Sequence, residues 1–443
     1  GAVSALQAHA VSIAMSSDIP QGTGLSSSHA LVLCILMAAN RIDPSLSLSL
    51  IDLLLLARAA ELEAGAVTGL GDQGVMLYGK RNCIVHAPFH VTDTGDVSLH
   101  SHPPRYARVS PQMAVLLADS GERRTLAEGP AKLRYALPRF AFSIALAVLQ
   151  AELVATVPSP AFVAEMHSLT SFNALRWRKA GGWPALRAFL LASLPVSTTV
   201  PELLALYPQL TETLELAATK YAIQTTQTIP LLPLVLWGLA EMQRSQYFFQ
   251  ALRRDALTEA GRCLSLAQAG EAYNTWPTSW EGWKEAVAAC PHLREAPGIF
   301  GASTAALDAL CQGAERAGAW GCSLTGAGGG GFVVALCEAA RCETILQAWT
   351  DTLQAPSLRV YPCAAAGVYD SPRMEETPRA APSFFRTLCI TGGAGFIGSS
   401  VAARLLKEGG TRVVLLDSFN DYYDQRLKLR NVQGLLSLAG QPG

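Results

Sequence analysis

The sequence predicts an α+β fold that is followed, at its C-terminal end, by a small α/β unit. Two glycine-rich turns lie far apart in the chain, and each adjoins an apolar segment: a helix follows 18–28 and a strand follows 323–331. Residues 130–275 carry mostly helical patterns separated by Pro and Gly. After a Pro-rich stretch, a strand, a glycine turn, a helix and a second strand follow one another.

The individual elements follow from apolar runs and their breakers. We expect a first strand at 10–16, helices at 26–40 and 51–64, and a buried strand at 113–119. Gly65, Gly69 and Gly71 end the second helix, so the next residues are expected in a glycine-rich turn. A turn from Trp320 leads through the second glycine loop into a strand at 332–337.

Composition limits the classes of function. The 443 residues predict two or three domains, and half of them are hydrophobic, which is enough for large cores. A net charge of −1 gives no reason to expect a nucleic acid or a membrane as a partner. The most apolar stretches, 140–157 and 229–240, are interrupted by polar residues or Pro and are expected as buried helices. Ten Cys without a CxxC pair favour reduced thiols and no thiolate metal site.

The first glycine turn, PQGTGLSSS at 20–28, has the properties of a phosphate site. Backbone N–H groups at a helix N-terminus are unpaired, and the helix dipole favours an anion there. Glycine allows the backbone to approach phosphates closely. Together with the loop TGAGGGG at 325–331, this turn predicts nucleotide phosphate binding.

A second phosphate signature begins after the linker at 370–385. The apolar strand 387–391 is followed by GGAGFIG at 392–398, a helix through Lys407, and a strand at 412–416 that ends at Asp417. This G-x-x-G-x-x-G pattern in a strand–turn–helix–strand context is typical of dinucleotide-binding domains. Only two strands precede the end of the sequence, so we expect this domain to be incomplete here.

Residues 10–370 resemble a sugar kinase of the GHMP superfamily, on the galactokinase and glucuronokinase side. The resemblance rests on four segments in the family's order: PQGTGLSSS at 20–28, GLGDQ at 69–73, DSGERRTL at 119–126 and LTGAGGGG at 324–331. It implies a two-lobed fold that binds ATP phosphates between the lobes, and a monosaccharide such as galactose, galacturonate or glucuronate as substrate. Nothing before Asp18 matches the family's N-terminal block, so the N-terminal part is expected to be incomplete.

The resemblance implies a role for each matching position. ATP would be held by Pro20, Gly22, Gly24, Leu25, Ser26, Ser27 and Ser28, with support from Gly326, Gly328, Gly329 and Gly330. Mg²⁺ would be bound by the hydroxyl of Ser28 and by one carboxylate, either Glu61 or Glu63. These two glutamates face different sides of a helix, and their spacing does not decide between them.

Asp72 would accept the proton of the attacking sugar hydroxyl. Arg123 or Arg124 could meet a uronate carboxylate or could be surface charge. His29 lies where the family usually has a small Ala, and we expect its side chain to be exposed to solvent.

Residues 386–430 resemble the start of an NAD-dependent epimerase of nucleotide sugars, in particular UDP-glucuronate 4-epimerase through DSFNDYYD at 417–424. The resemblance implies that NAD would be bound by Gly392, Gly395, Phe396, Ile397, Gly398 and Asp417.

Three functions compete. The first is an ATP- and Mg²⁺-dependent sugar 1-kinase in a kinase–epimerase fusion; the second is a non-catalytic nucleotide- or sugar-binding relative; the third is an epimerase, which needs residues beyond Gly443. We expect domains at 1–110, 111–369 and 386–443, a cytoplasmic location, and poor solubility from unpaired strand edges. The sequence does not predict the oligomeric state.

Overall fold

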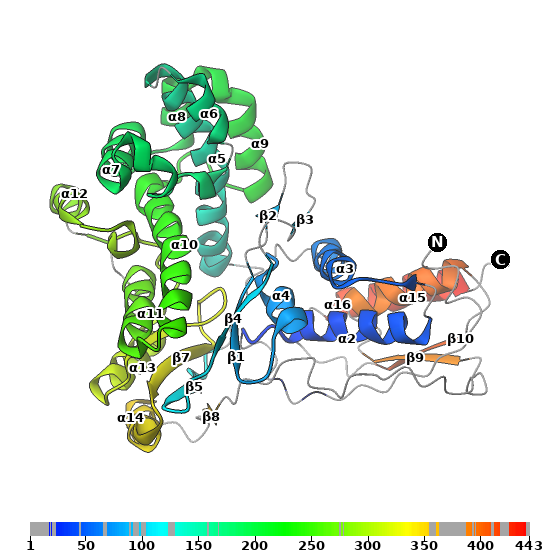
Figure 1. Cartoon of the computed structure of the whole chain (residues 1–443). Helices are drawn as coiled ribbons and strands as arrows, with labels where there is room; N and C mark the ends of the chain where they lie inside the picture. The colour runs from blue at the N-terminus through cyan, green and yellow to red at the C-terminus, as the bar shows by residue number, and fades with distance from the viewer. Residues whose placement is uncertain are drawn as a thin grey trace. The chain divides into compact units, whose positions relative to one another are not determined.

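Figure 1 shows the computed structural model of the chain. The chain forms two compact units. The first unit comprises Gly1–Pro20, Ser26–Tyr106 and Ala366–Gly443, and the second comprises Gln21–Leu25 and Ala107–Ala365. The structure describes residues 17, 19, 24–43, 46–64, 69–87, 90–91, 97–98, 103–122, 129–156, 159–166, 168–273, 276–277, 279–353, 360–362, 387–391, 394, 396–408, 412–416 and 425–439.

Three packed helices form the centre of the first unit: α2 (Ser27–Ile42), α3 (Leu50–Glu63) and α4 (Gly71–Tyr78). The start of α3 is fixed by a capping box between Ser49 and Asp52, which satisfies two backbone N–H groups. The hydrophobic residues that the three helices bury together are Val32, Leu33, Leu53, Leu54, Ala57, Leu70 and Leu77.

Short strands follow α4. Strand β1 (Cys83–His86) pairs with β4 (Arg105–Arg108), and β2 (His90–Val91) pairs with β3 (Val97–Ser98) in an antiparallel ladder. The Tyr106 hydroxyl donates to the Tyr78 carbonyl at 2.9 Å, which ties β4 to the end of α4.

The second unit contains an antiparallel sheet in the order β6-β7-β5-β8. Its strands are β5 (Met113–Asp119), β6 (Gly321–Leu324), β7 (Phe332–Glu338) and β8 (Val360–Pro362). Helices α13 (Ala305–Arg316) and α14 (Cys342–Leu353) pack on this sheet and close a core with fully buried Trp349 at its centre.

A helical region built around α5 and α10 completes the second unit (Figure 1). Its α-helices are α5 (Gly129–Thr156), α6 (Pro160–Glu165), α7 (Gly182–Ser193), α8 (Val200–Leu206), α9 (Thr211–Tyr221), α10 (Leu231–Arg253), α11 (Leu257–Glu271) and α12 (Trp280–Ala289). Short 3₁₀ helices are described at Leu169–Ser171, Arg176–Ala180, Pro208–Leu210, Leu293–Glu295 and Ala339–Arg341.

The segment Ala136–Thr156 of α5 is, by length and composition, apolar enough to cross a membrane. The helix nevertheless packs inside the protein, because Phe140, Ile144, Val148 and Leu153 are fully buried in the core. The interpretation of this stretch as a buried helix is therefore confirmed.

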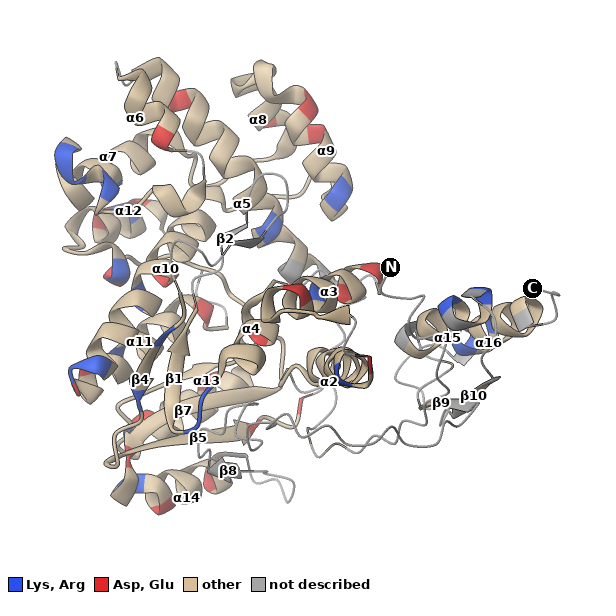
Figure 2. Cartoon of the chain, turned by 45° about the vertical axis from the view of Figure 1, so that its right-hand side comes forward, with Lys and Arg blue, Asp and Glu red and all other residues tan. Residues whose placement is uncertain are grey.

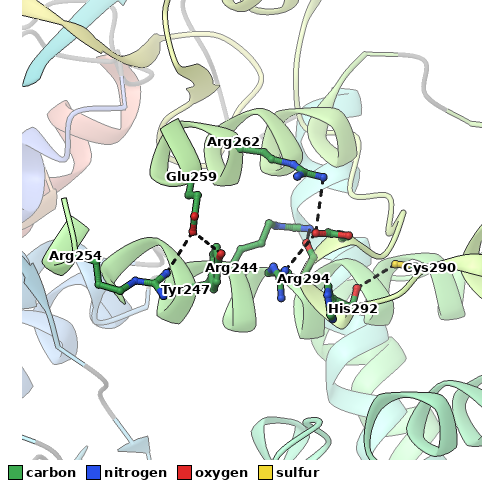
Figure 3. A network of polar contacts seen from close by, with 9 residues as sticks. Arg244, Tyr247, Arg254, Glu259, Arg262, Cys290, His292 and Arg294 are labelled. Atoms are coloured by element: carbon green, nitrogen blue, oxygen red, sulfur yellow. Dashed lines mark hydrogen bonds and ion pairs between the residues drawn. The ribbon is translucent and has the colours of Figure 1, made fainter. Parts of the chain in front are cut away.

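A network of charged side chains joins α10, α11 and the segment after α12 (Figure 3). Arg244 is buried, and it is held by Glu241 at 2.7 Å and by the Arg294 carbonyl at 3.1 Å. The Tyr247 hydroxyl and Arg254 both donate to Glu259, and the Arg294 guanidinium lies 4.4 Å from the centre of the Tyr247 ring. Pairing of this kind is what allows a guanidinium to be buried.

The C-terminal part is a parallel strand–helix–strand unit. Strand β9 (Thr387–Thr391) pairs in parallel with β10 (Arg412–Leu416), and α15 (Phe396–Glu408) connects them. Helix α16 (Gln425–Ala439) packs against α15, and the Asn431 amide donates to the Ala394 carbonyl at 3.1 Å.

Most of the element predictions are confirmed. The strand at 113–119 and the strands at 387–391 and 412–416 have the predicted bounds, and the helices at 26–40 and 51–64 differ from α2 and α3 by one or two residues. The strand expected at 10–16 and the linker lie outside the described residues. The cysteines whose side chains the structure describes are all free, in agreement with the expectation of reduced thiols.

Candidate active site

The start of α2 has an unusual conformation. Ser26, which precedes the helix, has a φ of 55°, a left-handed conformation that is rare for residues other than Gly. Its side chain does not cap the helix. Instead its hydroxyl donates to the Asp72 carboxylate, with 2.6 Å between Oγ and Oδ2. Strained backbone of this type is concentrated at functional sites.

The sequence predicted that Asp72 lies in a glycine-rich turn, but the structure shows that this prediction was wrong. Asp72 occupies the first turn of α4, which begins at Gly71. A carboxylate is favourable there because the helix dipole is positive at its N-terminus. The side chain is 54% exposed, and His29 Nδ1 lies 4.0 Å from Oδ2 with its own side chain 11% exposed. Asp72 is thus brought next to Ser26 and His29, which precede it by more than 40 positions.

The two candidate metal ligands on α3 have different environments. Glu61 lies on the buried face with Leu54 and Ala57 and is only 3% exposed, whereas Glu63 is exposed. Oε1 of Glu61 has no hydrogen-bond partner. A buried carboxylate oxygen without a partner is costly unless it meets a cation, so its environment favours Glu61 over Glu63 as a ligand of a hard metal ion.

The acidic residues of α3 and α4 lie close to a helix with almost no charge. In Figure 2 the ribbon is red at acidic residues of α3 and at the start of α4, while α2 carries only Arg41 near its C-terminal end. Within the described residues, no cluster of three or more His, Cys, Asp and Glu side chains could hold a metal ion. Beside phosphates, Mg²⁺ usually takes only one or two ligands from a protein.

The second glycine loop connects β6 to β7 in the other unit. Gly326, Gly328, Gly329, Gly330 and Gly331 all have positive φ, which explains why glycine fills these positions. The loop is closed by Thr325, whose N–H donates to the Phe332 carbonyl at 2.9 Å.

Backbone contacts hold this loop in place. Gly329 N–H donates to the Ala302 carbonyl at 2.7 Å, and Gly331 N–H donates to the Glu122 carbonyl at 3.1 Å. The Glu122 carboxylate accepts a hydrogen bond from the Thr304 hydroxyl. Sequence reasoning missed Ala302 and Thr304, because the segment GIFGAST carries no recognisable pattern, and it assigned Glu122 no role although it lies in the DSGERRTL motif.

A buried carboxyl group lies behind the loop. Glu271, at the end of α11, accepts a hydrogen bond from Ala302 N–H at 3.2 Å, and its own carbonyl accepts one from Ser303 N–H. Burial raises the pKa of Glu271 to about 8, although the Ala302 hydrogen bond acts in the opposite direction.

We expect this group to make stability depend on pH. The folded chain keeps the Glu271 proton up to a pH of about 8, whereas the unfolded chain releases it near the ordinary pKa of 4.5. The free energy of unfolding therefore falls as the pH rises from about 4.5 to about 8, by at most about 1.4 kcal/mol per pH unit. Glu271→Gln should remove this loss. Melting temperatures of both proteins at pH 5 and pH 8.5 test it, and equal pH dependence would contradict the assignment.

Several predicted site residues lie outside the described residues. They are Pro20, Gly22, Arg123, Arg124, Gly392, Gly395 and Asp417. Gly24 has a φ of 88°, as a glycine turn requires, and Ser28 is exposed on the first turn of α2. Phe396 and Ile397 begin α15, and Gly398 is buried in its first turn.

Comparison with family models gives matches in both units. Residues 1–80 match "GHMP kinases N terminal domain", and residues 248–355 match "GHMP kinases C terminal". Two segments of the chain therefore match the models of the two GHMP kinase domains. The Ser26–Asp72 pair lies in the segment matched by the first model, and the glycine loop lies in the segment matched by the second.

The likeness to solved structures of kinases is distant. Galactokinase from Lactococcus lactis in complex with galactose is 17% identical, covers 79% of this chain and 68% of its own, and has a TM-score of 0.49. Homoserine kinase from Cytophaga hutchinsonii is 14% identical, with 80% and 69% covered and a TM-score of 0.35.

A third comparison gives matches over a short segment of the chain. An uncharacterised 37.6 kDa protein of Escherichia coli O111:H- is 54% identical over 54 residues, and UDP-glucuronate 4-epimerase 2 of Arabidopsis thaliana is 50% identical over 54 residues. These matches cover 12% of this chain. The chain spans only 12 to 15% of the length of these relatives.

Proposed function

We propose that the chain is an ATP- and Mg²⁺-dependent sugar kinase that phosphorylates the anomeric hydroxyl of a monosaccharide, either galactose or a uronic acid such as galacturonate or glucuronate. The observation that carries this proposal is the Ser26–Asp72 pair at the start of α2, within a GHMP kinase domain. It combines an exposed carboxylate with a helix N-terminus suited to phosphate.

Asp72 is the base in this mechanism. The sugar hydroxyl gives its proton to the carboxylate while its oxygen attacks the γ-phosphorus of ATP, and ADP leaves. Ser26 holds Oδ2 of Asp72 through its hydroxyl, so the carboxylate has a fixed orientation before the sugar binds. Ser28 and Glu61 are the residues that would hold Mg²⁺, which would neutralise phosphate charge when bound.

Substitution of the two glutamates decides the metal ligand. We expect Glu61→Gln to lower the rate of ADP release by at least about 10-fold at low Mg²⁺ and to recover partly at high Mg²⁺. Glu63→Gln, the matched control on the exposed face of α3, should change the rate by roughly twofold or less. A large Mg²⁺-dependent loss in Glu63→Gln alone would reverse the assignment.

The substrate is tested by ADP release with Mg-ATP and each of galactose, galacturonate, glucuronate and arabinose. Release with one sugar would support the sugar kinase and name its substrate class. Binding of a sugar without release of ADP would favour the non-catalytic relative instead. If none of the four sugars bound and none caused release of ADP, the result would contradict the proposal.

We further propose that residues 386–443 are the start of an NAD-dependent nucleotide-sugar epimerase, so that the chain comes from a cytoplasmic kinase–epimerase fusion. The parallel pairing of β9 with β10 across α15 and the 54-residue match to a UDP-glucuronate 4-epimerase support this. NADH fluorescence in the presence of the chain tests it, and unchanged fluorescence at millimolar NADH would speak against cofactor binding by this part.

A further inference from the structure

The side chain of Gln73 is buried, but its amide group makes no hydrogen bond. The residue follows Asp72 in α4 and has no exposed surface. Neither Oε1 nor Nε2 has a hydrogen-bond partner. Its buried neighbours along α4 are Gly74 and Leu77, so a hydrophobic side chain would suit this position in the ligand-free chain.

Unpaired buried amide atoms have a cost. A polar group moved from water into a core without a hydrogen bond destabilises the fold, whereas an apolar group of the same shape does not. Such atoms are rare in native proteins, so their presence calls for an explanation.

A second buried group without a partner lies on the helix that packs against α4. Glu61 on α3 is 3% exposed, and its Oε1 has no partner either. Two buried, unsatisfied side chains on two packed helices indicate a polar site that is completed by something the ligand-free chain lacks. A carboxylate oxygen and an amide oxygen are both suited to a hydrated hard cation.

We propose that Gln73 is a positioning residue of the cation site, which orients Glu61 and is itself hydrogen-bonded only when Mg²⁺ and nucleotide are bound. The inference rests on the proposed kinase function and adds to it a residue that contributes to metal binding without being the base or a direct ligand. Supporting residues of this kind commonly change metal affinity by about 10–100-fold when they are removed.

The test separates metal-dependent binding from stability. Gln73→Met replaces the amide by an apolar chain of similar length. Dissociation constants of a non-hydrolysable ATP analogue are measured by calorimetry in Mg²⁺ and in EDTA. We expect about 10–100-fold weaker binding in Mg²⁺, unchanged binding in EDTA, and a melting temperature of the ligand-free chain that is higher by roughly 2 °C or more.

Gln243→Met is the matched control. Gln243 on α10 is half-buried, whereas Gln73 is fully buried; its Oε1 likewise has no partner, and it lies in the second unit. This variant should leave both dissociation constants unchanged.

Several outcomes would overturn the inference. One is an equal change of binding in Mg²⁺ and EDTA, and another is no change in either. The third is loss of folding in both Gln73→Met and Gln73→Leu, because an amide without partners cannot be required by the ligand-free fold. Sugar turnover with unaltered Mg²⁺ dependence in Gln73→Met would reject this inference alone, whereas a wild-type chain without Mg²⁺-dependent nucleotide binding would reject the kinase proposal as well.

Discussion

Asp72→Asn is expected to reduce the rate of sugar-dependent ADP release by about 10²–10⁴-fold, the usual contribution of a general base. An amide cannot accept the hydroxyl proton, but its oxygen can still accept the 2.6 Å hydrogen bond from Ser26. The fold and the position of the side chain are therefore kept while the base is lost. Initial rates with Mg-ATP and the best sugar measure the effect.

The control is the melting temperature of the same variant, which should stay near that of the wild type because the Asp72 side chain is 54% exposed. A variant that folds normally and keeps more than a tenth of the rate would show that another group accepts the proton, or that transfer needs no base.

Gly328→Ala is expected to be the most destabilising change in the glycine loop. The residue has a φ of 71°, and a Cβ atom there would lie 2.3 Å from the Ala302 carbonyl oxygen. That oxygen already accepts the Gly329 hydrogen bond and belongs to rigid backbone, so the loop itself must move. We expect a loss of about 3–4 kcal/mol in the free energy of unfolding, measured by urea titration.

Gly329→Ala separates the two causes of this loss. Gly329 has nearly the same φ, 72°, but a Cβ atom would have nothing within 4 Å. It should therefore cost only the left-handed conformation, about 1–2 kcal/mol. Equal losses in the two variants would show that φ alone, and not the contact with Ala302, makes glycine necessary at position 328.

The strands were the part of the fold that could be predicted well. Those at 113–119, 387–391 and 412–416 are short apolar runs bounded by polar or glycine-rich turns, so both of their ends are marked in the sequence. The pairing of β5 with β7 could not be predicted, because an apolar run does not state which distant strand it will join.

The sequence predicted which types of residue form the candidate site, but it predicted less of how these residues are arranged in space. The glycines before Asp72 indicated a turn, but Gly71 begins α4, since the packing of Leu70 and Leu77 against α2 and α3 outweighs glycine's low helix propensity. Spacing could not separate Glu61 from Glu63, because the choice depends on which face of α3 is packed. The Ser26–Asp72 hydrogen bond, across 46 positions, has no signature in the sequence.

The topology of the second unit also has a consequence for how the chain is made. Asp119 at the end of β5 pairs with Phe332 of β7, which is synthesised about 210 residues later. At roughly 5–20 residues per second, β5 waits on the order of 10–40 s for this neighbour, while the helices encoded in between can already fold. During that time a strongly apolar strand has both edges open. Early protection of nascent β5, for example by a chaperone, would therefore affect the yield of folded protein more than protection of any later segment.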